Sequence, residues 1–359
     1  MHDQKEDGMY EQGPIRPPSE ANSLLVRVTR NCPWNQCIFC PAYKGTKFSK
    51  RTVEEVKRDI DEMAEEYGPY SAQIRTVFLQ DADSLIIKTE DLLEILAHIK
   101  KKFPSVSRIT SYARATTIKR KSVEELKMLR EAGLNRIHAG MESGSDMVLK
   151  FVKKGITSSD IIEGGLKVKE SGIELSEYIM PGLGGKKMSE IHARETARVL
   201  NIIEPHFIRV RTFAIHPASP LARMVKEGTF IPMNDEEIVR EIRLLLENLR
   251  EMRSYFSSSD FSLNLLMEVD GYLDEKKESM LKLIDRYLSM DENKKKAYSL
   301  LRRASFFNYP LEVLENEEFM AKIMPEIEKI EKTREQGFDG YIRHLMSYQL
   351  PQPQTDNWN

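Results

Sequence analysis

The sequence has 359 residues, which is enough for one large α/β domain with a smaller domain beside it. Hydrophobic residues make up 40% and charged residues 31%, as in ordinary soluble proteins. The formal net charge of -2 provides no overall cationic field, so neither nucleic acid nor an anionic membrane is the default partner.

The first twenty residues, MHDQKEDGMYEQGPIRPPSE, are polar and contain proline. We expect a flexible arm over 1–20 and neither a signal peptide nor a membrane anchor there. No other stretch approaches the ~20 apolar residues that a membrane span requires. A disulfide framework built from three cysteines would leave one unpaired, which favours a reducing, cytoplasmic location.

After the arm, apolar runs of strand length alternate with amphipathic helical patterns. The runs are SLLVRVT (23–29), TVFLQD (76–81), RITSYA (108–113), RIHAGME (136–142), ELSEYIM (174–180) and FIRVRTFAI (207–215). Capping boxes at Thr52 with Glu55 and at Ser122 with Glu125 predict helix starts, and Gly133 lies where a helix should end. Six repeats of strand and helix predict a parallel sheet, either doubly wound or rolled into a partial barrel, over 21–228.

From about residue 232 the pattern changes to charged helices with one apolar stripe and no strand-like run between them. We therefore predict a helical C-terminal domain over 229–350 and a frayed tail over 351–359. The segment SLNLLMEVDGYL (262–273) mixes acidic and apolar residues, and we expect it to cover the mouth of the barrel.

All three cysteines, Cys32, Cys37 and Cys40, lie in the stretch RNCPWNQCIFCPAYKG directly after the first strand. Unrelated buried thiols would scatter along the chain. A structural zinc site needs a fourth ligand, for which His138 or His216 are the candidates. An iron–sulfur cluster held by three thiolates instead keeps one iron open to an external ligand.

The spacing C-x4-C-x2-C, with Phe39 before the last cysteine, resembles the cluster motif of the radical S-adenosylmethionine (radical SAM) superfamily. Further segments resemble, in order, the branch with the Elongator catalytic subunit, the tRNA methylthiotransferases and the oxygen-independent coproporphyrinogen oxidases. They are FLQDADSL (78–85), TSYARATTI (110–118), GMESGSDMVLKFVKKG (140–155), MPGLGG (180–185) and FIRVRTFAIHPASPL (207–221). The chain departs from that family in the extra residue of PWNQ and in the absence of Gly-Gly-Glu after the second strand.

The resemblance implies a partial (β/α)6 TIM-like barrel and a [4Fe-4S] cluster on the three cysteines, with S-adenosylmethionine on the open iron. The residues that it matches to cosubstrate binding are Phe39, Gln80, Asp81, Asp83, Arg114, Glu142, Ser143 and Gly182. The strand FIRVRTFA alternates so that Arg209 and Arg211 should point into the barrel, and Arg211 is added to this set. Tyr112, Tyr178 and Asp270 are candidates for the substrate side, although a structural role is the more frequent one for such residues.

The resemblance further implies an enzyme that cleaves S-adenosylmethionine reductively and abstracts hydrogen from a small-molecule or peptide substrate. Its electrons would come from an external donor of the flavodoxin or ferredoxin type. Because the sequence has no fourth cysteine, mechanisms with an auxiliary cluster or a cysteine relay are excluded. The alternatives are a tRNA-modifying radical SAM protein and a non-catalytic three-cysteine metal sensor.

Overall fold

The computed structural model describes residues 10–305, 309–334 and 336–350. Its main sheet has the strand order β1-β4-β5-β6-β7-β8-β9-β10 and forms an open, partial barrel. All neighbours pair in parallel except β9 and β10, which are antiparallel. The strands are β1 (Leu24–Arg27), β4 (Thr76–Gln80), β5 (Arg108–Ala113), β6 (Leu134–Glu142), β7 (Glu174–Ile179), β8 (Phe207–Val210), β9 (Tyr255–Ser257) and β10 (Gly271–Tyr272). A separate two-stranded sheet pairs β2 (Thr29–Arg30) with β3 (Ser49–Lys50).

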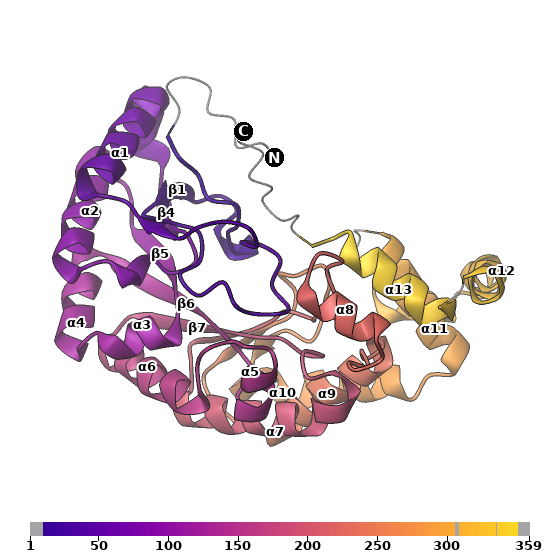
Figure 1. The fold of residues 1–359 in the computed structure, drawn as a ribbon. Coiled ribbons are helices and arrows are strands. Elements are labelled where there is room, and N and C mark those ends of the chain that lie inside the picture. The colour runs from indigo at the N-terminus through magenta and orange to yellow at the C-terminus, as the bar shows by residue number, and fades with distance from the viewer. Residues whose placement is uncertain (1–9, 306–308, 335, 351–359) are drawn as a thin grey trace.

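Helices cover the outer face of the main sheet (Figure 1). Those that alternate with its strands are α1 (Val53–Tyr67), α2 (Thr89–Lys102), α3 (Ala115–Arg120), α4 (Val123–Ala132), α5 (Asp146–Phe151), α6 (Ser158–Glu170), α7 (Gly185–Ile203) and α8 (Pro220–Lys226). The C-terminal helices are α9 (Asp235–Asn248), α10 (Leu273–Leu288), α11 (Glu292–Ala304), α12 (Glu317–Thr333) and α13 (Gly337–Ser347). Within the described ranges, none of the helices has the length and apolar character that crossing a membrane would require.

The local signals in the sequence explain the helix ends. Thr52 and Ser122 each accept a hydrogen bond from the third helical amide, and Glu55 and Glu125 each accept one from the N-cap amide in return. Gly133 ends α4 in the left-handed region at φ 110°. The capping boxes and the alternating strands and helices of the predicted α/β fold are therefore confirmed.

The two faces of the strands differ as the period of two requires. On β4, Val77 and Leu79 belong to the main hydrophobic core, whereas Phe78 faces the inside of the barrel. There its ring lies 5.0 Å from that of Tyr112 and 6.3 Å from that of His138, measured between centroids. The barrel interior is consequently aromatic and polar, and the apolar core lies between the sheet and the helices.

Two short strands were not predicted. β9 extends the parallel sheet beyond β8, and β10 closes it as an antiparallel edge, although both lie within the range predicted to be helical. Strands of two and three residues are too short to show a period of two, so only their tertiary pairing identifies them. Because α9 also packs on α7, a domain boundary between residues 228 and 229 remains a prediction. The predicted tail at 351–359 lies outside the described residues.

The described part of the predicted arm lies against the inner strands. The Gly13 amide donates to Oε1 of Gln80 at 2.9 Å, and Nε2 of Gln80 donates to the Gly13 carbonyl at 3.1 Å. Farther along, Oε1 of Glu20 lies 3.3 Å from Nε2 of His138. A Cβ on Gly13 would lie 2.1 Å from Oδ1 of Asp81, so this crossing of the chain requires glycine.

Candidate functional site

The three cysteines lie in the loop between β2 and β3, at the C-terminal edge of the parallel strands. All three are free thiols of intermediate exposure. Burial raises the pKa of the Cys40 thiol to about 11, and it also raises the pKa of Cys37, against the opposing effect of the Lys154 ammonium. Within the described ranges, no three His, Cys, Asp or Glu side chains are grouped as a single metal ion would require.

Trp34, within the segment PWNQ, has a structural role that the sequence did not reveal. The indole Nε1 of Trp34 donates to the Lys153 carbonyl at 2.8 Å, and the Arg114 guanidinium lies 5.1 Å from the centre of its ring. A Cβ on Gly155 would lie 2.3 Å from the indole, so the ring packs directly on that glycine. The longer loop thus fixes the cysteine stretch to the turn after α5.

A buried ion pair lies next to the cysteine loop. Nζ of Lys154 is 2.8 Å from Oε1 of Glu142, with only 13% and 12% of the two side chains exposed. The same ammonium lies 5.9 Å from the ring centre of Phe39, and its charge acts on Cys37. Although burial lowers the pKa of Lys154, Glu142 and Cys37 outweigh that effect and hold it above its usual value. Lys154, which the sequence analysis missed, therefore brings positive charge to a loop of potential thiolates.

Three of the predicted cosubstrate positions, Gln80, Asp81 and Asp83, are fully buried. Asp81 pairs with Arg27 at 2.8 Å and accepts a hydrogen bond from the Asn31 amide at 2.9 Å. Asp81 therefore anchors the start of the cysteine loop.

Asp83 accepts hydrogen bonds from the Thr117 hydroxyl at 2.6 Å and from the Arg114 amide at 3.2 Å. Burial nevertheless raises its pKa to about 6. This carboxyl group ties the end of β4 to the start of α3.

The end of β6 is irregular at the predicted Glu142 and Ser143. The register with β7 shifts between Gly140 and Glu142, and Glu142 has a φ of 60°. On the neighbouring strand β7, Glu177 pairs with Ala139 of β6. Its side chain is buried, which raises its pKa to about 8, so it is a neutral acid at pH 7. Gly182, with φ 89°, begins the facing loop after β7.

Arg209 of β8 and Arg211, one residue past its end, share one carboxylate, that of Asp260. Arg209 also donates to Oγ of Ser176 at 3.0 Å, and Nη1 of Arg211 lies 2.8 Å from Oδ1 of Asp260. The Arg211 guanidinium lies 4.7 Å from the ring centre of Tyr178 on the inner face of β7. Both arginines are therefore buried inside the barrel, which excludes a solvated strand end for Arg209. Asp260 lies just after β9 and is 49 positions from Arg211 in the sequence. No local sequence signal marks it.

Two further predictions fall on this wall of the barrel. The Tyr178 hydroxyl forms a hydrogen bond of 3.3 Å with Nδ1 of His138. Burial lowers the pKa of that histidine to about 4, so it is neutral at pH 7. Asp270 instead accepts hydrogen bonds from the Tyr255 hydroxyl and the Ser258 amide, which makes it a support of the segment after β9.

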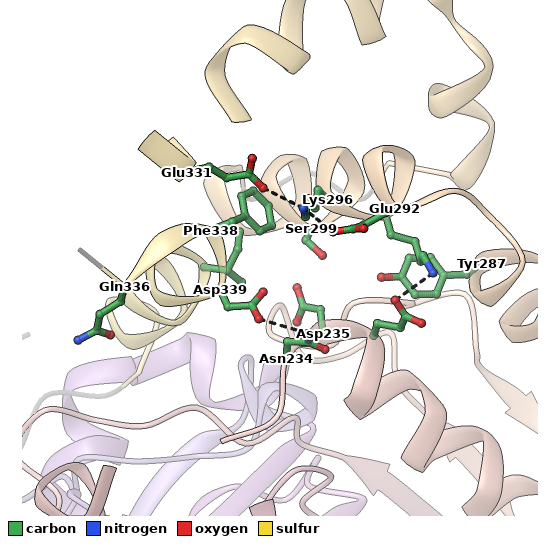
Figure 2. A pocket seen from close by; sticks show the side chains of 13 residues that line it. Asn234, Asp235, Tyr287, Glu292, Lys296, Ser299, Glu331, Gln336, Phe338 and Asp339 are labelled. Atoms are coloured by element: carbon green, nitrogen blue, oxygen red, sulfur yellow. Dashed lines mark hydrogen bonds and ion pairs between the residues drawn. The ribbon is translucent and has the colours of Figure 1, made fainter. Parts of the chain in front are cut away.

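A separate hollow of about 460 Å³ lies between the C-terminal helices (Figure 2). Its charges are paired within the chain: Lys296 lies 2.5 Å from Glu292 and 2.8 Å from Glu331, and Lys295 lies 2.9 Å from Glu236. No residue of the cysteine loop lines this hollow. It is thus a polar cavity apart from the candidate site.

Fold and site together define a parallel α/β partial barrel that carries a three-thiol loop at the C-terminal edge of its strands. Residues 26–196 match the Radical SAM superfamily. The predicted resemblance to this superfamily is therefore supported over these residues, which make up just under half of the chain. This superfamily uses a [4Fe-4S] cluster and S-adenosylmethionine.

Parts of the chain are similar to curated proteins, and its fold is similar to that of a solved structure. The chain is 27% identical over 173 residues to an uncharacterized methyltransferase of Pyrococcus horikoshii, covering 47% of this chain and 35% of that protein. It is 25% identical over 121 residues to a tRNA uridine(34) acetyltransferase of Methanocaldococcus jannaschii, covering 33% and 22%. Its fold is similar to that of the cobalamin-dependent S-adenosylmethionine radical enzyme OxsB, with a TM-score of 0.50, 16% identity, and 90% and 58% coverage. The matches span about a third or less of the length of the two curated relatives.

Proposed function

We propose that this protein is an enzyme that cleaves S-adenosylmethionine reductively at a [4Fe-4S] cluster held by Cys32, Cys37 and Cys40. The observation that carries the proposal is the position of the three thiols, on the loop between β2 and β3 and within the matched residues. When bound, such a cluster and cosubstrate supply a 5′-deoxyadenosyl radical, which abstracts hydrogen from a substrate.

The donor set fits the cluster. Three free, partly exposed thiols on one loop offer three soft ligands. Burial keeps Cys37 and Cys40 protonated in the protein alone, so iron would replace their protons on binding. The ammonium of Lys154 and the guanidinium of Arg114 both act on Cys37 and would offset the negative charge of the bound thiolates.

The chain also supports a place for S-adenosylmethionine beside the loop. Glu142 is linked to Phe39 of the cysteine stretch through Lys154, and Arg114 is linked to the stretch through Trp34. Ser143 and Gly182 belong to the two loops that follow β6 and β7. Gln80, Asp81 and Asp83 support these parts from within, because their side-chain oxygens already accept hydrogen bonds from the protein.

The substrate would lie within the barrel, against Tyr112, Tyr178 and Arg211. This wall offers phenol groups and a guanidinium, which suit a small polar molecule or a peptide side chain. Electrons would come from an external flavodoxin or ferredoxin. A tRNA substrate is a second candidate, favoured only by the similarity to the tRNA uridine(34) acetyltransferase.

Anaerobic reconstitution with iron and sulfide tests the proposal. The wild-type protein should bind four irons and four sulfides, and with dithionite it should convert S-adenosylmethionine to 5′-deoxyadenosine. Cys37→Ala should abolish product, whereas Lys47→Ala, an exposed position in the same loop, should leave it unchanged. A colourless protein with one zinc and no sulfide would refute the cluster, and product from Cys37→Ala would refute the assignment of its ligands.

A further inference from the structure

A buried histidine and a buried glutamate connect the two loops at the C-terminal ends of β6 and β7. Nε2 of His192, on α7, lies 3.2 Å from the Glu142 carbonyl oxygen, and its Nδ1 lies 3.2 Å from Oε1 of Glu241, on α9. That same Oε1 accepts a hydrogen bond from the Gly182 amide at 2.7 Å. The side chains of His192 and Glu241 are only 3% and 2% exposed. The route from Glu142 to Gly182 therefore runs through two side chains that solvent does not reach.

The contacts of His192 favour its protonated form. Both ring nitrogens face oxygen atoms, the carbonyl of Glu142 and the carboxyl group of Glu241. Burial lowers the pKa of His192, but Glu241 outweighs that effect and raises it above 6.5. In this dry environment neither Nδ1 of His192 nor Oε2 of Glu241 has a hydrogen-bond partner among the described residues, so the 3.2 Å contact between the two side chains is electrostatic.

The pair holds backbone at the point where the strand pairing ends, since the last backbone bond to the segment after β8 runs from the Phe213 amide to the Pro181 carbonyl at 2.8 Å. β6 ends at Glu142 in a positive-φ conformation after its register has shifted, and β7 ends at Ile179. Past that point a backbone hydrogen bond from the Met180 amide to the Glu142 carbonyl, at 2.9 Å, links the segments that follow the two strands. The Gly182 amide lies beyond the strand pairing and donates its hydrogen bond to Glu241 on α9.

We propose that His192 and Glu241 are positioning residues that set the distance between the Glu142 loop and the Gly182 loop for S-adenosylmethionine. This inference rests on the proposed function. Glu241 lies outside residues 26–196, so a helix beyond the matched domain completes the site. The C-terminal region thus acts on the cosubstrate through the backbone of Gly182 and not through a side chain that contacts it.

The first test needs no cluster. In amide hydrogen exchange of the protein as purified, His192→Leu and Glu241→Ala should each accelerate exchange of residues 180–184 at least tenfold. His192→Gln should restore slow exchange, because its amide nitrogen can still donate to the Glu142 carbonyl. Glu247→Gln, at an exposed position on the same helix, serves as the control. Unchanged exchange in both variants would overturn the inference.

The second test uses the reconstituted protein. We expect His192→Leu and Glu241→Ala to raise the KM for S-adenosylmethionine about tenfold, while kcat for 5′-deoxyadenosine changes less than twofold and the absorbance of the cluster stays the same. Should Glu241→Ala fail to fold, Glu241→Met, which removes the acceptor for the Gly182 amide but keeps most of the side-chain volume, replaces it. An unchanged KM together with faster exchange would overturn the positioning role. A wild-type protein that forms no 5′-deoxyadenosine would instead overturn the proposed function and leave the exchange result standing.

Discussion

Asp260→Asn removes the shared carboxylate charge of the barrel wall and should destabilise the protein clearly. Asp260 neutralises two guanidinium groups whose side chains are only 7% and 10% exposed, and it is itself 18% exposed. Removing one partner of a buried ion pair costs about 3–5 kcal/mol, and the exposure of Asp260 places this case near about 3 kcal/mol. With an unfolding entropy of about 2.1 cal/mol/K per residue, 359 residues give about 0.75 kcal/mol/K. The expected fall in Tm is therefore about 4 °C.

Thermal unfolding followed by circular dichroism measures this effect. Burial opposes the ionised form of Asp260, but Arg211 and Arg209 outweigh it and hold its pKa below 3.8. A depressed folded pKa stabilises the protein above the unfolded pKa and ceases to do so as the pH falls through the folded value. The difference between wild type and variant should thus be complete at pH 7 and shrink below pH 3.8. The control, Asp274→Asn, removes an exposed pair with Arg253 and should shift Tm by less than about 1 °C. Equal shifts for both variants would refute the reasoning.

Three further predictions concern the surroundings of the cysteine loop. Burial raises the pKa of Glu177 in the folded protein to about 8 from 4.5, so the stability of the wild type should decline as the pH rises between these values. In urea unfolding, Glu177→Gln should therefore be more stable than the wild type at pH 8 but not at pH 4. Gly13→Ala would place a methyl group 2.1 Å from Oδ1 of Asp81, so amide exchange of residues 10–16 should accelerate, and equal exchange would contradict the close crossing of the chain at this glycine. Trp34→Ala removes the ring that packs on Gly155, so a chelator should strip iron from the reconstituted variant faster than from wild type, and equal release rates would show that the indole does not hold the loop.

The parts of the fold that the sequence predicted are those encoded locally. The capping boxes use residues three positions apart, and the strand alternation that turned Arg209 and Arg211 inward depends on neighbours in one strand. The cysteine spacing is likewise local, which is why the sequence alone suffices to propose a site on this loop, which lies between β2 and β3.

The parts that could not be predicted depend on contacts between distant segments. Asp260 meets Arg211 across 49 positions, and Glu241 meets Gly182 across 59. Neither acid differs in its neighbours from the surface acids of the C-terminal helices. Trp34 had a visible signal, the extra residue in the cysteine spacing, but its partner Gly155 lies in another turn and only the fold identifies it.

The contacts within the described part of the chain also show which of the predicted cosubstrate residues still has a carboxylate oxygen without a partner. A cationic amino group needs a carboxylate oxygen that is not already engaged. Asp81 accepts from Arg27, the Asn31 amide and the Tyr43 hydroxyl. Among the described residues Glu142 engages Oε1 with Lys154 alone, and 12% of its side chain is exposed. We accordingly propose Glu142 as the acid of this pair that meets S-adenosylmethionine, while Asp81 stabilises the loop that carries the thiols.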